Sequence, residues 1–157
     1  MTVPRSGAPR TLAELSIPSE PGNERRATEE VARAVSELGL PERTLERLKT
    51  AVAEATMNAM EHGNRYSPNV PVKIQAWLLK ERLLVRIIDR GGSPPPSADA
   101  QRPDLEAKLE GTQTPRGWGL FLIKNMVDEV RVSANPDHHT VELITYLKGD
   151  DDAGYAP

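Results

Sequence analysis

The chain has 157 residues, of which 38% are hydrophobic and 27% are charged, as expected for one soluble globular domain. Its 20 basic and 23 acidic residues give a net charge of −3, which offers no bulk attraction to nucleic acid or anionic lipid. The lack of cysteine excludes disulfides and thiol nucleophiles, and no run approaches the roughly 20 apolar residues that span a bilayer. We therefore expect a cytoplasmic protein that contacts neither nucleic acid nor membrane.

The first part of the chain predicts a leader, a strand and a helix. Residues 1–10 hold two prolines, a glycine, a serine and two arginines, which predicts a disordered leader. Leu12–Ile17 is a short strand candidate that ends before a proline. Between Glu24 and Leu38 apolar residues recur at spacings of three and four, which predicts an amphipathic helix that Gly39 ends.

A second predicted helix carries a polar stripe. Its apolar pattern runs from Pro41 to Gly63, about six helical turns. Within it, Glu54, Asn58 and His62 are spaced four residues apart, so an unbroken helix places them one above another on a single face. An acid and an amide on a stretch rich in alanine and methionine indicate that this face meets a ligand or partner.

The middle of the chain predicts a β-hairpin and then a long loop. Alternating apolar residues from Val70 to Leu78 and the run Leu83–Ile88 flank a short polar connection. Residues 90–116 contain five prolines and little apolar periodicity. A loop of this length inside a compact domain is typical of a lid or binding loop.

Regular structure is predicted again in the last third of the chain. Gly117 and Gly119 open a helix, and the strands Glu129–Ala134 and Thr140–Leu147 follow it. Residues 149–157 form an acidic tail that we expect to be disordered.

The order of these elements predicts the fold class. Strand, helix, helix, hairpin, lid, helix and hairpin define an α+β domain over residues 11–148, with a lid at 90–116. We expect a two-layer sandwich in which about three helices cover one face of a mostly antiparallel β-sheet. The other face is then solvated or available to a partner.

Three separated signals carry chemistry, and each has a structural alternative. The amide of Asn58 beside the carboxylate of Glu54 suits a hard cation such as Mg²⁺, although an asparagine can also cap a neighbouring backbone. Asp89 follows an apolar strand and is either a ligand or a turn residue. Gly117 and Gly119 either expose helix N–H groups to an anion such as phosphate or only loosen the backbone. The spacing fits neither a Rossmann motif nor a P-loop.

Taken together, these motifs resemble a known family. The order E-x-x-x-N-A-x-x-H-G, D-x-G, a long lid and G-x-G-L-F-L-I-K-N-M-V-D-E-V is similar to the ATP-binding domain of the GHKL superfamily, which includes gyrase and histidine kinases. Within it, the chain most resembles the small anti-sigma-factor serine/threonine kinases of bacterial partner switching. The resemblance extends from Leu12 to about Leu147, nearly the whole chain.

The resemblance implies a Bergerat-type fold and assigns contacts to ATP. Asn58 would hold Mg²⁺ against the phosphates, and Asp89 would accept a hydrogen bond from the adenine amino group. Gly91 would let the backbone approach the base. Gly117 and Gly119 would receive the phosphates at the helix start.

Further roles follow from the same resemblance. Glu54 would be the general base for the attacking hydroxyl, and Thr140 would touch adenine through water. Arg116 would neutralise the γ-phosphate or else be a solvated lid residue. His138 and His139 are interpreted as turn residues, because adjacent strand residues point to opposite faces and no further metal ligands cluster near them.

The function implied is a protein serine/threonine kinase that uses ATP and Mg²⁺ to phosphorylate an anti-sigma-factor antagonist. It would sequester a sigma factor or similar regulator and form a homodimer. Two alternatives remain: a non-catalytic module in which nucleotide only shapes a partner-binding surface, and an ATPase without a protein substrate. The catalytic domain of a two-component histidine kinase is not expected, because no upstream helix carries a phosphoacceptor histidine and the ATP-binding layout uses the entire length.

Overall fold

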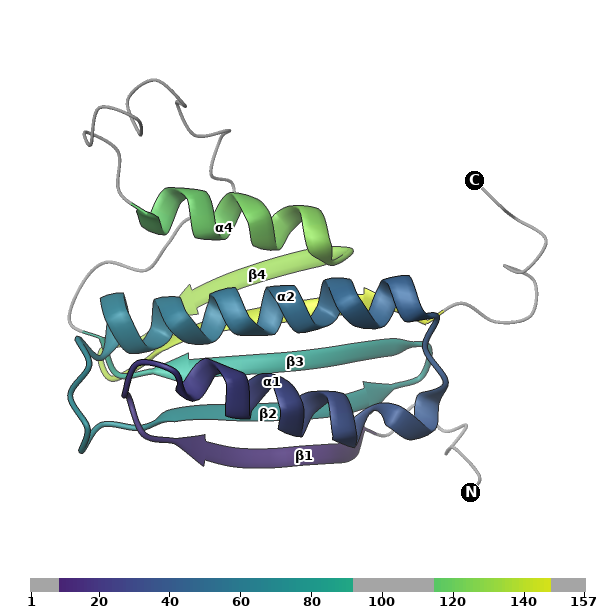
Figure 1. Ribbon diagram of the computed structural model, residues 1–157, viewed down its shortest axis with the longest axis horizontal. Helices are drawn as coiled ribbons and strands as arrows, with labels where there is room; N and C mark the ends of the chain where they lie inside the picture. Colours follow the sequence, from purple (N-terminus) through teal and green to yellow (C-terminus); the bar gives the residue numbers. More distant parts are fainter. Residues whose placement is uncertain (1–8, 92–114, 148–157) are drawn as a thin grey trace.

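The structure, a computed structural model, describes residues 9–91 and 115–147, without the side chains of residues 115–120. In this part of the chain, five strands form a single sheet, and the helices α1, α2 and α4 lie together over one of its faces (Figure 1). This arrangement confirms the predicted α+β sandwich. None of the described helices is long and apolar enough to cross a membrane.

The sheet has the strand order β1-β2-β3-β5-β4, and every neighbouring pair is antiparallel. The strands are β1 (Arg10–Ile17), β2 (Val72–Leu79), β3 (Arg82–Asp89), β4 (Glu129–Ala134) and β5 (His139–Tyr146). The two predicted hairpins are therefore present, and β5 lies between β3 and β4 rather than at an edge.

The predicted domain limits need two corrections. Arg10 was assigned to the leader, yet it is the first residue of β1 because it pairs with Leu78 of β2. The predicted lid also ends too late, because residues 115 and 116 already belong to the helix α4 (Pro115–Met126). The limits at 148 and 149, and residues 92–114 of the lid, lie outside the described residues.

The first helix, α1 (Asn23–Ala34), is shorter than the predicted helix. A 3₁₀ turn, Ser36–Leu38, takes up the rest of that stretch. The hydroxyl of Ser36 donates a hydrogen bond of 2.8 Å to the carbonyl oxygen of Arg33, a local bond that competes with regular helix. Gly39 ends the turn with φ of 64°, as its position after the apolar pattern predicts.

The second helix also differs from its prediction at the C-terminal end. The α-helix α2 spans Glu42–Asn58, and the next five residues, Ala59–Gly63, form a wider π-helical turn. The backbone N–H of Asn64 closes this turn on the carbonyl of Ala59 at 2.8 Å. A π turn rotates less per residue than an α turn, so the stripe of polar side chains does not continue straight past Asn58.

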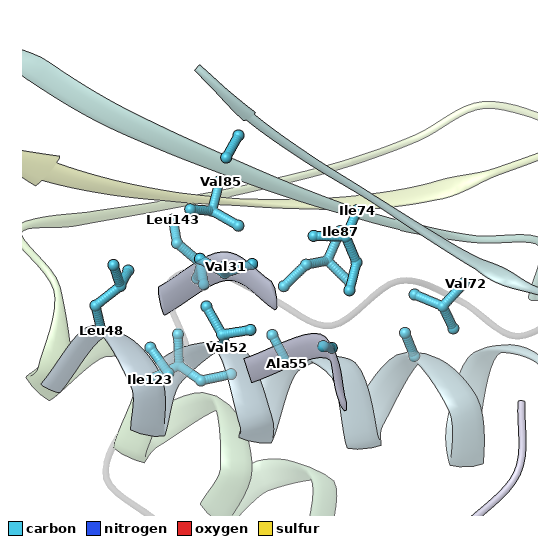
Figure 2. Packing of buried hydrophobic residues seen from close by; sticks show 14 of the residues in the cluster. Val31, Leu48, Val52, Ala55, Val72, Ile74, Val85, Ile87, Ile123 and Leu143 are labelled. Carbon is cyan, nitrogen blue, oxygen red and sulfur yellow. The ribbon is translucent and has the colours of Figure 1, made fainter. Parts of the chain in front are cut away.

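The hydrophobic core lies between the sheet and the three helices (Figure 2). Leu83, Val85 and Ile87 alternate along β3 and are buried against helical residues such as Val52 and Ile123. Since side chains alternate between faces, the same alternation turns Asp89 toward the helices. Apolar packing thereby decides which face of the sheet receives the acid.

A buried asparagine joins four segments at one end of the domain. The side-chain amide of Asn64 donates to the hydroxyl of Ser19 at 3.1 Å and to the carbonyl of Val70 at 3.0 Å. Its side-chain oxygen accepts a bond of 2.8 Å from the backbone N–H of Arg90. Asn64 is 5% exposed, so these bonds replace water around a fully buried amide.

We predict that Asn64→Ala lowers the free energy of unfolding by about 1–3 kcal/mol, because it leaves buried donors and acceptors without partners. Chemical denaturation followed by circular dichroism measures the change. Asn69→Ala, an exposed position in the same turn, is the matched control and is expected to stay within about 0.5 kcal/mol of wild type. Equal stability of the two variants would contradict the structural role of Asn64.

Candidate functional site

Four chain segments that carry the predicted site residues meet at one end of the domain (Figure 1). The C-terminal end of α2, the end of β3 and the start of β5 lie there, together with the start of α4 (Pro115–Met126). Residues far apart in the sequence are thus gathered on the helix side of the sheet.

Asp89 lies in a narrow cradle formed by two glycines. Its side chain is 10% exposed, and its Oδ1 accepts a 2.7 Å hydrogen bond from the backbone N–H of Gly91. A Cβ at Gly63 would lie 2.2 Å from Cγ of Asp89, and one at Gly91 would lie 2.8 Å from Oδ1. Only glycine fits at positions 63 and 91, so the backbone lies directly against the Asp89 carboxylate. A flat ligand that binds the carboxylate needs this close approach of the backbone.

Glu54 and Asn58 lie one helical turn apart on α2, and both are half-buried. Burial raises the pKa of the Glu54 carboxyl, and the nearby Glu24 carboxylate of α1 raises it further. Among the described residues, no hydrogen bond engages the side-chain amide of Asn58. The end of α2 therefore offers a carboxylate tuned toward proton acceptance beside an amide that can ligate a cation.

His62, the third member of the predicted stripe, lies in the π-helical turn and not in α2. Its Nε2 is buried and makes no hydrogen bond to any residue in the described part of the chain. The nearest charged partner is Oε2 of Glu61 at 3.9 Å. The three side chains are consequently not one continuous row, because the helix widens after Asn58.

The start of α4 lies earlier than the sequence predicts. The helix begins at Pro115, so Arg116 and Gly117 lie in its first turn and Gly119 begins the second. N–H groups of a first helical turn have no partner within the helix and can bind an anion. Nothing is described of the Arg116 side chain, so its proposed role stays a prediction.

The structure does not bring Thr140 to Asp89. Thr140 lines a hollow on the open face of the sheet, with Lys73 and Arg86, whereas Asp89 faces the helices. Its neighbour His139 is the residue opposite Asp89 in the β3–β5 register, and His139 is 6% exposed. Because side chains alternate along β5, His139 lies beside Asp89, where Thr140 was expected, and Thr140 lies on the open face.

Several residues of the site were not recognised from the sequence as part of it. Gly63 was expected only at the end of the second predicted helix, Asn64 was assigned no role in the site, and His139 was interpreted as a turn residue. The signal for His139 was available, since Val141 and Leu143 share its parity and predict that it faces the core with them. The electrostatic interaction between Glu24 and Glu54 has no such signal, because it depends on the packing of α1 against α2.

The side chains near the end of α2 fit a magnesium ion that takes most of its ligands from phosphate and water. They do not fit an ion that is surrounded by protein ligands alone. Among the described residues, no group of three or more His, Cys, Asp or Glu side chains could hold a metal ion. Mg²⁺ in phosphoryl-transfer sites commonly takes one or two protein oxygens and completes its shell with phosphate and water. A single amide oxygen from Asn58 satisfies that pattern.

Residues 17–145 match the histidine kinase-like ATPase domain family, and the protein belongs to this family. The family match confirms the GHKL resemblance, and it implies that the nucleotide used is ATP.

Two relatives and one solved structure sharpen this assignment. The chain is 31% identical over 146 residues to the serine-protein kinase RsbW of Bacillus subtilis (strain 168), covering 87% of this chain and 86% of the relative. It is 26% identical over 140 residues to the anti-sigma F factor of Thermoanaerobacter sp. (strain X514), covering 89% and 96%. The crystal structure of the RsbU and RsbW domains of Rv1364c from Mycobacterium tuberculosis has the same fold, with a TM-score of 0.63 and 18% identity. That similarity covers 89% of this chain and 32% of the longer one.

We predict that Glu54→Gln stabilises the protein at neutral pH. The pKa of Glu54 is raised in the folded state, so its charged form opposes folding, and stability is lost as pH rises through that pKa. Glutamine removes this penalty, and its advantage disappears below about pH 4, where the wild-type carboxyl is protonated in both states.

Thermal unfolding between pH 4 and pH 7.5 tests this prediction. Glu29→Gln replaces an exposed glutamate of α1 and serves as the matched control, with little expected change at any pH. A Glu54→Gln protein no more stable than this control at pH 7 contradicts the inferred environment of the acid.

Proposed function

We propose that this protein is an ATP-dependent serine/threonine kinase that phosphorylates an anti-sigma-factor antagonist and also binds a sigma factor or similar regulator. The observation that carries the proposal is that the C-terminal part of α2, which carries Glu54 and Asn58, the end of β3, which carries Asp89, and the start of α4 are gathered at one end of the domain. The names of the relatives, a serine-protein kinase and an anti-sigma F factor, support the same conclusion.

Each residue at this end has a role in nucleotide binding. Asp89, held between Gly63 and Gly91, accepts the adenine amino group, and Gly91 lets the backbone lie against the base. The N–H groups at the start of α4, Gly117 among them, bind phosphate oxygens, and Gly119 allows close approach. Arg116 adds positive charge near the γ-phosphate. The contact first assigned to Thr140 passes to His139, which lies beside Asp89.

Transfer requires little covalent chemistry from the protein. A serine or threonine hydroxyl oxygen of the antagonist bonds to the γ-phosphorus, while the bond from that phosphorus to the bridging oxygen of ADP breaks. The hydroxyl proton passes to the Glu54 carboxylate, whose raised pKa makes it a better base than an ordinary glutamate. Phosphorylated antagonist and ADP then leave.

Magnesium is proposed as the cofactor, held by Asn58 and the phosphates. When bound, it supplies charge that offsets the phosphate oxygens during transfer. The free amide of Asn58 among the described side chains supports this assignment. Comparing nucleotide affinity with and without magnesium, in wild type and Asn58→Ala, tests it directly.

The open face of the sheet is the proposed homodimer interface. It presents Trp77 under the Arg86 guanidinium, 4.7 Å from the ring centre, and Arg86 is paired with Glu142 at 2.7 Å. Tyr146 on the same face is 44% exposed. Aromatic rings supply apolar contact area for a dimer interface, and the charged groups above them keep the same surface compatible with water in the monomer. Light scattering of the purified protein at micromolar concentration decides between dimer and monomer.

The proposed location is the cytoplasm, where sigma factors and RNA polymerase act. Fractionation of cells that express the protein at its natural level tests this assignment.

We predict that Glu54→Gln binds ATP as wild type does and loses phosphate transfer by a factor of about 10²–10⁴, the usual contribution of a positioned general base. Radiolabelled ATP and purified candidate antagonists provide the transfer assay, and calorimetry with ADP provides the affinity. Glu46→Gln, an exposed glutamate on the same helix, is the control. Undiminished transfer by Glu54→Gln would count against the base. Absence of transfer by wild type to every antagonist, with intact nucleotide binding, would favour the non-catalytic module.

We predict that Asp89→Asn weakens ADP binding by about tenfold or more, because it replaces a charged acceptor with a group that also donates. Calorimetry measures the change, and Asp137→Asn in the exposed β4–β5 turn is the control. Unchanged affinity in Asp89→Asn would refute the adenine assignment.

A further inference from the structure

His139 is a buried histidine in direct contact with the proposed adenine acceptor. It is the first residue of β5, it pairs with Asp89 in the strand register, and 7% of its side chain is exposed. The backbone of His139 is held between two strands, because it pairs with Asp89 of β3 on one side and with Ala134 of β4 on the other. Its position follows from the strands and not from a flexible turn.

The contact has a defined chemistry. Nδ1 of His139 lies 3.3 Å from Oδ1 of Asp89, and within the described residues this nitrogen makes no hydrogen bond. A carboxylate only accepts hydrogen bonds, so an Nδ1 without its proton would face the acid with two acceptors opposed. The proton therefore belongs on Nδ1, where a small ring rotation aligns it with Asp89. Hydrogen bonds of this kind often tighten only in the complex with ligand.

We propose that His139 is a specificity-determining residue, which holds Asp89 as an ionised, acceptor-only carboxylate and thereby selects 6-amino purines over 6-oxo purines. The inference rests on the proposed function, since it concerns the base of the same nucleotide. His139 acts through Asp89 and is a positioning residue.

The selectivity between the two kinds of purine follows from which groups donate and which accept hydrogen bonds. The 6-amino group of adenine donates a hydrogen bond, whereas the 6-oxo group of hypoxanthine accepts one. An ionised carboxylate attracts the first and repels the second, while a protonated carboxyl can donate to the oxo group and so tolerates both. Hydrogen bonds donated to Oδ1 favour the ionised form of the Asp89 carboxyl group. The backbone N–H of Gly91 donates one such bond, and Nδ1 of His139 donates a second once the ring has rotated.

Asparagine and leucine variants of His139 test the proposal in a matched pair. The two side chains are close in shape, but only asparagine can donate to Asp89. Calorimetry with ADP and with IDP in the full-length protein measures the ratio of the two dissociation constants. We expect His139→Leu to reduce the preference for ADP by about tenfold, the worth of one hydrogen bond to a charged group. His139→Asn should keep it within about threefold, and Thr140→Val, on the open face, should match wild type.

Each outcome has a definite meaning. An unchanged ADP preference in His139→Leu overturns the proposal, and so does an equal loss in both variants, because shape alone then explains it. A wild-type protein that binds neither nucleotide removes the proposed function itself. If His139→Leu does not fold, nitrogen NMR of the wild-type ring decides: a protonated Nδ1 supports the proposal and an unprotonated Nδ1 overturns it.

Discussion

The close approach of Gly63 and Gly91 to Asp89 is the constraint on which the site depends. No side chain larger than hydrogen fits at either glycine, so the π-helical turn after α2 and the end of β3 can meet only through bare backbone. The π-helical turn that ends at Gly63 and the buried amide of Asn64 stabilise the same junction. Together they place an acid against peptide planes, where a flat ring can lie with its edge toward the carboxylate.

Rigid elements set the geometry around this junction. Burial of the apolar face of β3 and β5 determines that Asp89 and His139 turn toward the helices, whereas Thr140 turns away. A one-residue slip in register would reverse every one of these directions, and the packed core prevents it. The proposed nucleobase end of the site, at Asp89 and His139, is therefore as firmly placed as the core itself.

The proposed catalytic end of the site is held at some expense of stability. Glu54 is half-buried and lies close enough to Glu24 for their charges to repel, and its pKa is raised as a result. An exposed glutamate would be easier for the fold to accommodate, but it would be a weaker base. Strain of this kind is common where function and stability compete for the same position.

Sequence alone determined the element order, the two-layer α+β plan, the core-facing alternation of the strands and the three motifs that carry the ATP-binding resemblance. Those features depend on local periodicity and on spacing, which a chain displays before it folds. Tertiary structure alone decided where α2 widens, that Asp89 is the partner that His139 meets across the sheet, and that Glu24 perturbs Glu54. These depend on how segments distant in sequence pack together, and a glycine or a histidine carries no mark of the partner it will meet across a sheet.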